Sequence, residues 1–243
     1  SNYLSRDIPI VICAKGIEQN SAALMSEIVD DTLPGRPIAV LSGPTFAAEV
    51  AKGFPTAITL ATHNNNLGTE LIQAIGTQKL RPYLSTDLIG SEIGGAVKNV
   101  IAIACGIADG HGFGDNARAA LITRGLAEMT RLCVAKGGRP ETMMGLSGLG
   151  DLTLTCSSSQ SRNYSLGTAL GRGEGLEKVL KSRKSIAEGV TSAAAISTLA
   201  KRLGIEMPIT QSVAAIVNGT VTVDDAIKNL LARPFKIENH SGR

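Results

Sequence analysis

The sequence has 243 residues, 43% of them hydrophobic and 19% charged, with a formal net charge of +3. This composition is typical of a folded soluble protein with one large or two modest domains, and it excludes a disordered chain. The mild charge, the 3% aromatic content and the lack of tryptophan argue against a nucleic-acid-binding protein. No apolar run approaches the ~20 residues of a membrane span, and the first residues do not form a signal peptide. We therefore expect a cytoplasmic protein with no membrane insertion.

The four cysteines are widely scattered along the chain. None belongs to a CxxC pair, and no histidine lies near one at the spacing of metal ligands. We predict free thiols in a reducing compartment, with no disulfide and no metal. They are Cys13, Cys105, Cys133 and Cys156.

The first third of the chain alternates strands and helices. Short apolar runs rich in β-branched residues predict strands buried on both faces, and segments with apolar residues at helical spacing predict helices between them. Strands are predicted at 8–14, 37–43 and 56–62, with a weak edge strand at 80–85, and helices at 21–33 and 66–76. Ser21 is the candidate N-cap of the first helix. This order indicates a sheet layered with helices.

Beyond residue 86 the strand signal stops. Helices are predicted at 87–108, 117–136, 161–170, 176–181, 191–203, 210–218 and 222–232. The predicted fold is α/β plus all-α, a partial Rossmann-type sheet in residues 1–85 followed by a helical C-terminal domain in residues 86–243. Three or four strands with two helices make an incomplete sheet for a nucleotide-binding fold.

Two loops follow the first two predicted strands, KGI at 15–17 and SGPTFAAE at 42–49. Open α/β sheets bind ligands at the carboxyl ends of their strands, where Lys15 and the Gly43 turn would lie. Free backbone N–H groups at a helix start can hold an anion there. Ordinary turn chemistry is the alternative for the SGP segment.

A third segment, GLSGLGDLTLTCSSSQSRN at 145–163, lacks GxGxxG spacing and follows no strand. It is interpreted as a flexible loop that carries Asp151, a hydroxyl-rich run and the pair Arg162–Asn163. A guanidinium beside an amide and hydroxyls suits a phosphate, although a solvated polar loop explains the composition equally well. In a fourth segment, 185–194, Glu188 precedes a helix, where a carboxylate can also simply complement the helix dipole.

Lys98 interrupts the apolar stretch GGAVKNVIAIACG. Burial of an ammonium without a partner is costly. Either its stem is buried while the charge reaches water, or the charge acts on a group bound beside it. The residues alone leave both explanations open and indicate an α/β-plus-helical protein that binds a small anion.

Taken together and in order, AKGI, SGPTFAAEV, GGAVKNVIAIACGIADG, GLSGLGDLTLTC, SRN and AEGV resemble the bacterial type of NAD(P)-dependent glycerol-3-phosphate dehydrogenase. The resemblance runs from Ile8 to Arg233. One departure is the missing GxGxxG unit, which cradles the cofactor pyrophosphate. The sequence is therefore expected to correspond to the family without its first ~80–100 residues, a length typical of that nucleotide-binding unit.

The resemblance implies hydride transfer between NAD(P)H and C2 of dihydroxyacetone phosphate, giving sn-glycerol 3-phosphate for phospholipid synthesis. It makes Lys98 the proton donor in reduction and the acceptor in oxidation, with Asp151 as its partner. The implied substrate contacts are Lys15, Gly43, Thr45, Lys98, Asn99, Asp151, Ser161, Arg162 and Asn163, and the implied cofactor contacts are Lys15, Ala47, Arg162, Ile186 and Glu188. The sequence decides neither between NAD and NADP nor the oligomeric state, although a homodimer would be unsurprising.

Two other functions stay open. A 3-hydroxyacid or 6-phosphogluconate type of dehydrogenase also pairs a Rossmann domain with helices and a lysine, although the SRN and SGPTFAAE segments argue against it. A fragment that folds through its helices but does not bind cofactor is the alternative from another class.

Overall fold

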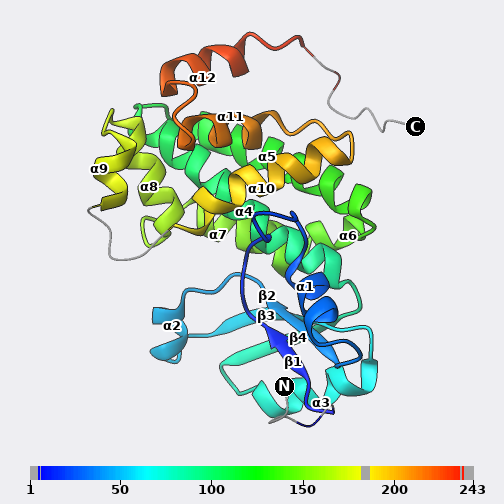
Figure 1. The fold of residues 1–243 in the computed structure, drawn as a ribbon. Helices are drawn as coiled ribbons and strands as arrows, with labels where there is room; N and C mark the ends of the chain where they lie inside the picture. The colour runs from blue at the N-terminus through cyan, green and yellow to red at the C-terminus, as the bar shows by residue number, and fades with distance from the viewer. Residues whose placement is uncertain (1–4, 6, 182–186, 236, 238–243) are drawn as a thin grey trace.

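The computed structural model describes residues 5, 7–181, 187–235 and 237. Four strands form one sheet in the order β1 (Ile10–Ile12), β2 (Ile38–Ser42), β3 (Thr56–Ala61) and β4 (Leu80–Ser85). The pairs β1–β2 and β3–β4 are parallel, whereas β2 and β3 are antiparallel. The carboxyl ends of β1 and β2 therefore lie at the same edge of the sheet, below the helices in Figure 1.

Three helices accompany the sheet: α1 (Met25–Thr32), α2 (Ala47–Ala51) and α3 (Asn65–Ile75). The prediction that α1 begins after Ser21 was wrong. The Ser21 hydroxyl instead donates a hydrogen bond of 2.6 Å to the Glu18 carboxylate within the preceding loop. The prediction that the first strand is buried on both faces was also too strong, because β1 spans only three residues and two of them are half-buried.

The remaining helices form a bundle above the sheet (Figure 1). They are α4 (Leu88–Gly110), α5 (Asp115–Lys136), α6 (Pro140–Met143), the π-helical turn η1 (Leu146–Gly150), α7 (Asp151–Cys156), α8 (Arg162–Gly171), α9 (Leu176–Lys181), α10 (Glu188–Arg202), α11 (Pro208–Val217) and α12 (Val223–Leu231). This arrangement confirms the predicted fold class, a partial Rossmann-type sheet followed by helices.

Helix α4 forms the centre of this bundle, and every residue from Gly90 to Ala108 is buried. It is long and apolar enough to cross a membrane, but 94% of its most apolar window is buried inside the protein. That degree of burial is typical of a core helix. Glycines bring α8 against it: a Cβ on Gly106 would collide with the Tyr164 carbonyl, and one on Gly167 with the Ile103 carbonyl.

The structure corrects the interpretation of residues 145–163 as a flexible loop. Most of this segment is helical, as η1, α7 and the start of α8, and only residues 157–161 connect helices. Leu152 and Cys156, one turn apart, are fully buried. Gly148 packs so closely on Met143 that a side chain would collide with its backbone. The glycines of this segment therefore permit close packing, where the composition suggested flexibility.

Candidate active site

Lys98 lies on the buried helix α4, and its ammonium has partners inside the protein. Its Nζ donates to Asp151 Oδ1 at 2.7 Å and to Thr155 Oγ1 at 2.9 Å. The Lys98 side chain is 8% exposed and that of Asp151 is fully buried. The structure excludes the first explanation, because the ammonium is buried on Asp151 and does not reach water; that the charge acts on a bound group stays a prediction.

Lys15 reaches the same carboxylate from the sheet. It follows β1, and its Nζ donates to Asp151 Oδ2 at 2.7 Å and to the Gly43 carbonyl oxygen at 2.8 Å. Lys15, Lys98 and Asp151, from here on the lysine–aspartate cluster, thus bring together three of the predicted site residues. Two ammonium groups on one carboxylate leave a net positive charge, which favours an anionic ligand.

The turn after β2 holds its shape because residue 43 is a glycine. Gly43 has a φ of +146°, and a Cβ there would lie 3.2 Å from the Ile58 Cα of the neighbouring strand β3. Its carbonyl oxygen accepts from Lys15 and also from Thr45 Oγ1 at 3.2 Å. The turn therefore positions the Lys15 ammonium as well as bordering the site.

Burial lowers the pKa of Lys98 from its ordinary value of 10.5. The negative charge of Asp151 opposes this shift by stabilising the ammonium, and the positive charge of Lys15 adds to it. A lysine whose pKa is lowered toward neutrality can both donate and accept a proton in a reaction at working pH.

A second group of polar side chains adjoins the cluster through Asn99, the residue after Lys98. Asn99 Nδ2 donates to Glu188 Oε2 at 3.1 Å, and Asn99 Oδ1 accepts from Asn163 Nδ2 at 3.0 Å. Glu188 Oε1 lies 3.6 Å from Nη2 of Arg162, and both of these side chains are about half-exposed. Asn163 Oδ1 also accepts from the Gly189 N–H at 2.9 Å. Three helices thus connect a half-exposed guanidinium, through Glu188 and Asn99, to the residue that follows the buried lysine.

The other predicted contacts lie at the border of this arrangement. Ser161 is buried and caps α8, because its Oγ accepts from the Tyr164 N–H at 3.2 Å. Ala47 is exposed at the start of α2. A hydrogen bond connects this helix to the segment before α8, because Gln160 Nε2 donates to Glu49 Oε1 at 3.1 Å. Ile186 lies outside the described residues. Ligand contacts at Ser161, Ala47 and Ile186, like those of all the other predicted site residues, stay predictions.

Thr155 is a site residue that the sequence reasoning missed. Besides accepting from Lys98, its hydroxyl donates to the Asp151 carbonyl oxygen at 2.6 Å, one turn earlier in α7. The i, i+4 spacing of Asp151 and Thr155 was the available signal. Interpreting the segment as a loop concealed it, because the spacing has meaning only on a helix.

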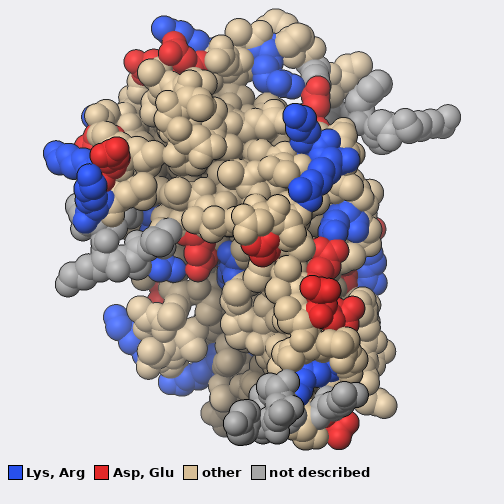
Figure 2. All heavy atoms as spheres, viewed as in Figure 1, with Lys and Arg blue, Asp and Glu red and all other residues tan. Residues whose placement is uncertain are grey.

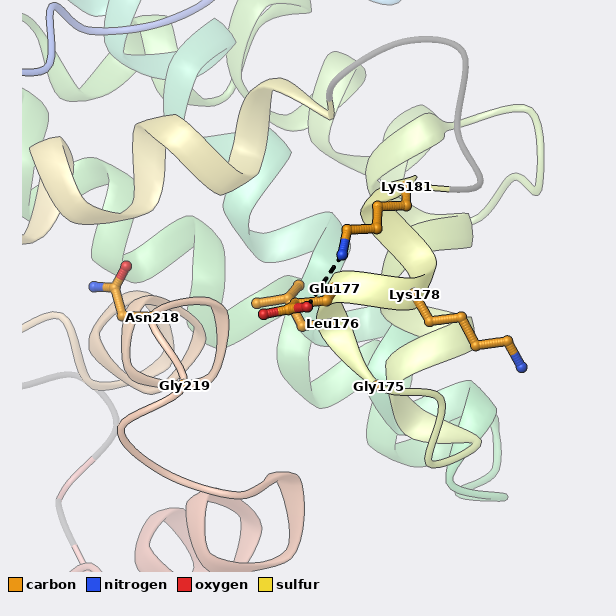
Figure 3. A pocket seen from close by; sticks show the side chains of 7 residues that line it. All are labelled: Gly175, Leu176, Glu177, Lys178, Lys181, Asn218 and Gly219. Carbon is orange, nitrogen blue, oxygen red and sulfur yellow. Dashed lines mark hydrogen bonds and ion pairs between the residues drawn. The ribbon is translucent and has the colours of Figure 1, made fainter.

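Charges of both signs also lie elsewhere on the molecule. Figure 2 shows them dispersed over the viewed face without a single basic patch. A cavity of about 980 Å³ lies against α9 and the turn after α11 (Figure 3), and none of the residues that line it belongs to the lysine–aspartate cluster. There Lys181 pairs with Glu177 at 3.3 Å.

Comparisons with known proteins show the family of this chain. A family model described as the NAD-dependent glycerol-3-phosphate dehydrogenase C-terminus matches residues 87–228, and the corresponding N-terminus model matches residues 1–68. The chain belongs to this family. The C-terminal match contains Lys98 and Asp151, and the N-terminal match contains Lys15.

Individual relatives give the same result. The chain is 57% identical over 236 residues to a glycerol-3-phosphate dehydrogenase [NAD(P)+] of Maricaulis maris, covering 97% of this chain and 71% of the relative. It is 59% identical to that of Parvibaculum lavamentivorans, covering 95% of this chain and 69% of the relative. The crystal structure of glycerol-3-phosphate dehydrogenase from Coxiella burnetii has 43% identity and a TM-score of 0.89, over 93% of this chain and 69% of that one.

Proposed function

We propose that the lysine–aspartate cluster is the acid–base centre for interconverting dihydroxyacetone phosphate and sn-glycerol 3-phosphate with NAD(P)H. The observation that carries this proposal is the buried Lys98 ammonium, held on Asp151 with a second ammonium, that of Lys15, on the other carboxylate oxygen. Membership of the family supplies the reaction, and the cluster supplies the groups that the reaction needs. These are a proton donor of lowered pKa and a positive field for an anionic substrate.

In the reducing direction, Lys98 Nζ donates a proton to the carbonyl oxygen of dihydroxyacetone phosphate as negative charge develops there. Asp151 holds Nζ in place and keeps part of the ammonium form against the effect of burial. Thr155 fixes a second hydrogen bond of the same nitrogen. In the oxidising direction neutral Lys98 accepts the proton of the alcohol.

Arg162 is the proposed contact for the substrate phosphate. Its guanidinium fork suits phosphate oxygens, and it lies at the half-exposed end of the polar network that begins at Asn99. In this proposal Lys15 and the Gly43–Thr45 turn enclose the substrate from the sheet side. Asn163 orients Asn99 and the start of α10 and thereby supports the phosphate end.

The residues present fit the nicotinamide end of the cofactor. The half-exposed Glu188 carboxylate is a suitable acceptor for a carboxamide N–H, and Ala47 and Arg162 would border the same region. When bound, NAD(P)H would supply the hydride for reduction, and NAD(P)+ would accept it in oxidation. The 243 residues contain no GxGxxG segment for the pyrophosphate.

The cellular setting follows from the same proposal. A dehydrogenase of this kind would supply glycerol phosphate for phospholipid synthesis in the cytoplasm. The division at residue 85 and a homodimer both stay predictions, and sedimentation of the protein would test the second.

A thermal shift with dihydroxyacetone phosphate tests the substrate assignment. At about 100 times Kd, the ligand should stabilise the protein by about 2.7 kcal/mol. The shift should be lost in Arg162→Ala and retained in Arg233→Ala, a change at an exposed ion pair with Glu206. A shift of equal size with 6-phosphogluconate, or none with dihydroxyacetone phosphate in the presence of NADPH, would contradict the proposal.

A further inference from the structure

Glu92 is a buried carboxylate on α4 that the proposed reaction does not use. It is 5% exposed and lies six residues before Lys98 on the same helix. Its Oε1 accepts from the Ser26 N–H at 2.8 Å, and its Oε2 accepts from the Ser26 hydroxyl at 2.5 Å. Ser26 belongs to the first turn of α1, on the sheet side of the molecule. Glu92 therefore joins the central helix to the start of a helix from the other part of the fold.

Helix α1 depends on this external carboxylate. Its N-cap position is occupied by Leu24, which has no polar side chain to accept from the first N–H groups. Glu27 accepts a hydrogen bond from the Leu24 N–H at 2.8 Å, and Glu92 accepts one from the Ser26 N–H. Without Glu92, the Ser26 N–H and hydroxyl would both lose their partner inside the protein.

The start of α1 is also the end of the loop that carries Lys15. Within this loop, from Lys15 to Leu24, Ile17 and Leu24 form an isolated antiparallel bridge, and the Glu18 N–H donates to the Ala23 carbonyl at 3.0 Å. Ile17 and Leu24 are buried in the same hydrophobic cluster as α4. Fixing Leu24 and Ser26 therefore fixes Ile17, two residues from Lys15.

Glu92, Gly95 and Lys98 form a row on α4 in which each residue adjoins the next, because positions three apart are neighbours on a helix. The row winds around the helix by about 120° from Glu92 to Lys98, since 3.6 residues make one turn. Glu92 holds Ser26, Gly95 leaves room for the Lys15 stem, and Lys98 meets Asp151. A Cβ on Gly95 would lie 3.3 Å from Lys15 Cγ, so the stem of Lys15 packs directly against α4 at this glycine.

We infer that Glu92 is a positioning residue for Lys15: by holding the start of α1 against α4, it sets the Lys15 ammonium on Asp151. This inference rests on the proposed role of Lys15 in substrate binding. It adds a residue that touches neither substrate nor cofactor and acts through the Lys15 loop.

The chain offers a matched control for a purely structural effect. Glu128 on α5 is also buried and also serves a helix start, since it accepts from the N–H groups of Ile209 at 2.7 Å and Thr210 at 3.1 Å. It holds α11, and none of its described hydrogen bonds reaches the Lys15 loop. Glu92→Ala and Glu128→Ala should both lower stability, but only the first should disturb Lys15.

The first test is hydrogen exchange of the holoenzyme, followed by mass spectrometry. Glu92→Ala should speed exchange in residues 15–26 by about tenfold or more, which corresponds to a local opening easier by about 1.4 kcal/mol. Glu128→Ala should leave these residues unchanged, and Glu92→Gln, which retains an acceptor for the Ser26 N–H, should restore most of the protection. Unchanged exchange in Glu92→Ala would overturn the inference whatever the enzyme does.

The second test is a double-mutant cycle on the KM for dihydroxyacetone phosphate. Glu92→Ala should raise KM about five- to tenfold with little change in kcat, and should raise it no further in a Lys15→Met background, because both changes remove the same contact. If the KM of the double variant rises by the product of the two single increases, Glu92 and Lys15 act independently and the inference is overturned. If Lys15→Met alone leaves KM unchanged, the proposed role of Lys15 is wrong, and the exchange result still decides whether Glu92 holds the loop.

Discussion

Lys98 and Asp151 meet inside the protein although 53 residues separate them in the sequence, with 2.7 Å between Nζ and Oδ1. The ammonium comes from the middle of α4 and the carboxylate from the first residue of α7. Removing one partner of a buried pair leaves an uncompensated charge, which is strongly unfavourable. The pair is therefore a fixed feature of the fold as well as the centre of the proposed chemistry.

The pH dependence of the two directions should follow the lowered pKa of Lys98. Reduction needs the ammonium, so its rate should fall as pH rises through this pKa, at a pH below the ordinary lysine value of 10.5. Oxidation needs the neutral amine, so its rate should rise over the same interval. Parallel pH–rate profiles in both directions are the measurement. A change of rate centred at the ordinary lysine pKa would contradict the assignment of Lys98 as the group that transfers the proton.

Substitutions of the two charged neighbours of Lys98 should move the sloping limb of the pH–rate profile, where the rate changes with pH, in opposite directions. Asp151→Asn removes a charge that raises the pKa of Lys98, so the limb should shift to lower pH. Lys15→Met removes a charge that lowers it, so the limb should shift to higher pH. The profiles of the residual activity report both shifts, and the same direction in both variants would be inconsistent with the electrostatics of the cluster.

Arg162→Ala should weaken substrate binding with little effect on stability. Loss of a charge-assisted contact to a phosphate typically costs about 1.5–3 kcal/mol, equivalent to a KM about 10- to 100-fold higher. The ion pair with Glu188 is half-exposed, and such pairs contribute little to folding. Steady-state kinetics and thermal melting together check this prediction, with Arg233→Ala as the control. An unchanged KM would exclude Arg162 from phosphate binding.

Thr155→Val should lower kcat about tenfold while the protein stays folded. Valine keeps the shape of threonine but removes the hydroxyl that accepts from Lys98, and one hydrogen bond to a charged group typically contributes about 1.5–3 kcal/mol. Thr155→Ser keeps the hydroxyl and should keep most of the activity. Equal activity of the valine and serine variants would show that this hydroxyl does not matter to turnover.

Gly106→Ala should destabilise the helical domain. An added methyl would collide with the Tyr164 carbonyl where α8 crosses α4, and overpacking of this kind typically costs about 1–3 kcal/mol, or several degrees of Tm. Gly114 has open space around it but is the N-cap of α5, so Gly114→Ala lacks the collision and should cost only the small N-cap preference for glycine, less than Gly106→Ala. Equal melting temperatures for the two variants would contradict the proposed close packing.

The sequence predicted most of the helices and strands because their periodicity is strong. The antiparallel pairing of β2 and β3 and the start of α1 depend on contacts that periodicity does not carry. Ser21 has a side chain suited to an N-cap, but its hydroxyl donates to the Glu18 carboxylate within the loop and does not cap α1. In residues 145–163, a glycine-rich composition suggested flexibility, whereas Gly148 allows close packing on Met143, and Gly94 of α4 allows close packing on Ser147.

The candidate site shows the same division between local and long-range information. Lys98 and Asp151 were singled out from the sequence and received their roles from the family resemblance, and their salt bridge exists only after α7 packs on α4. The hydroxyl of Thr155 and the carboxylate of Glu92 depend wholly on such packing. Thr155 offered only its i, i+4 spacing from Asp151, which has meaning once the segment is known to be a helix, and Glu92 stands outside the motifs that carried the resemblance.

The most direct test of the account is turnover of the holoenzyme carrying Lys98→Met, with dihydroxyacetone phosphate binding measured separately by calorimetry. Losing a positioned proton donor typically costs about 10²–10⁴ in rate. We predict a fall in kcat of that size, while Kd for the substrate changes by less than about tenfold because Lys15 and Arg162 still supply positive charge. Turnover close to that of the unchanged enzyme would contradict the central claim that Lys98 transfers the proton.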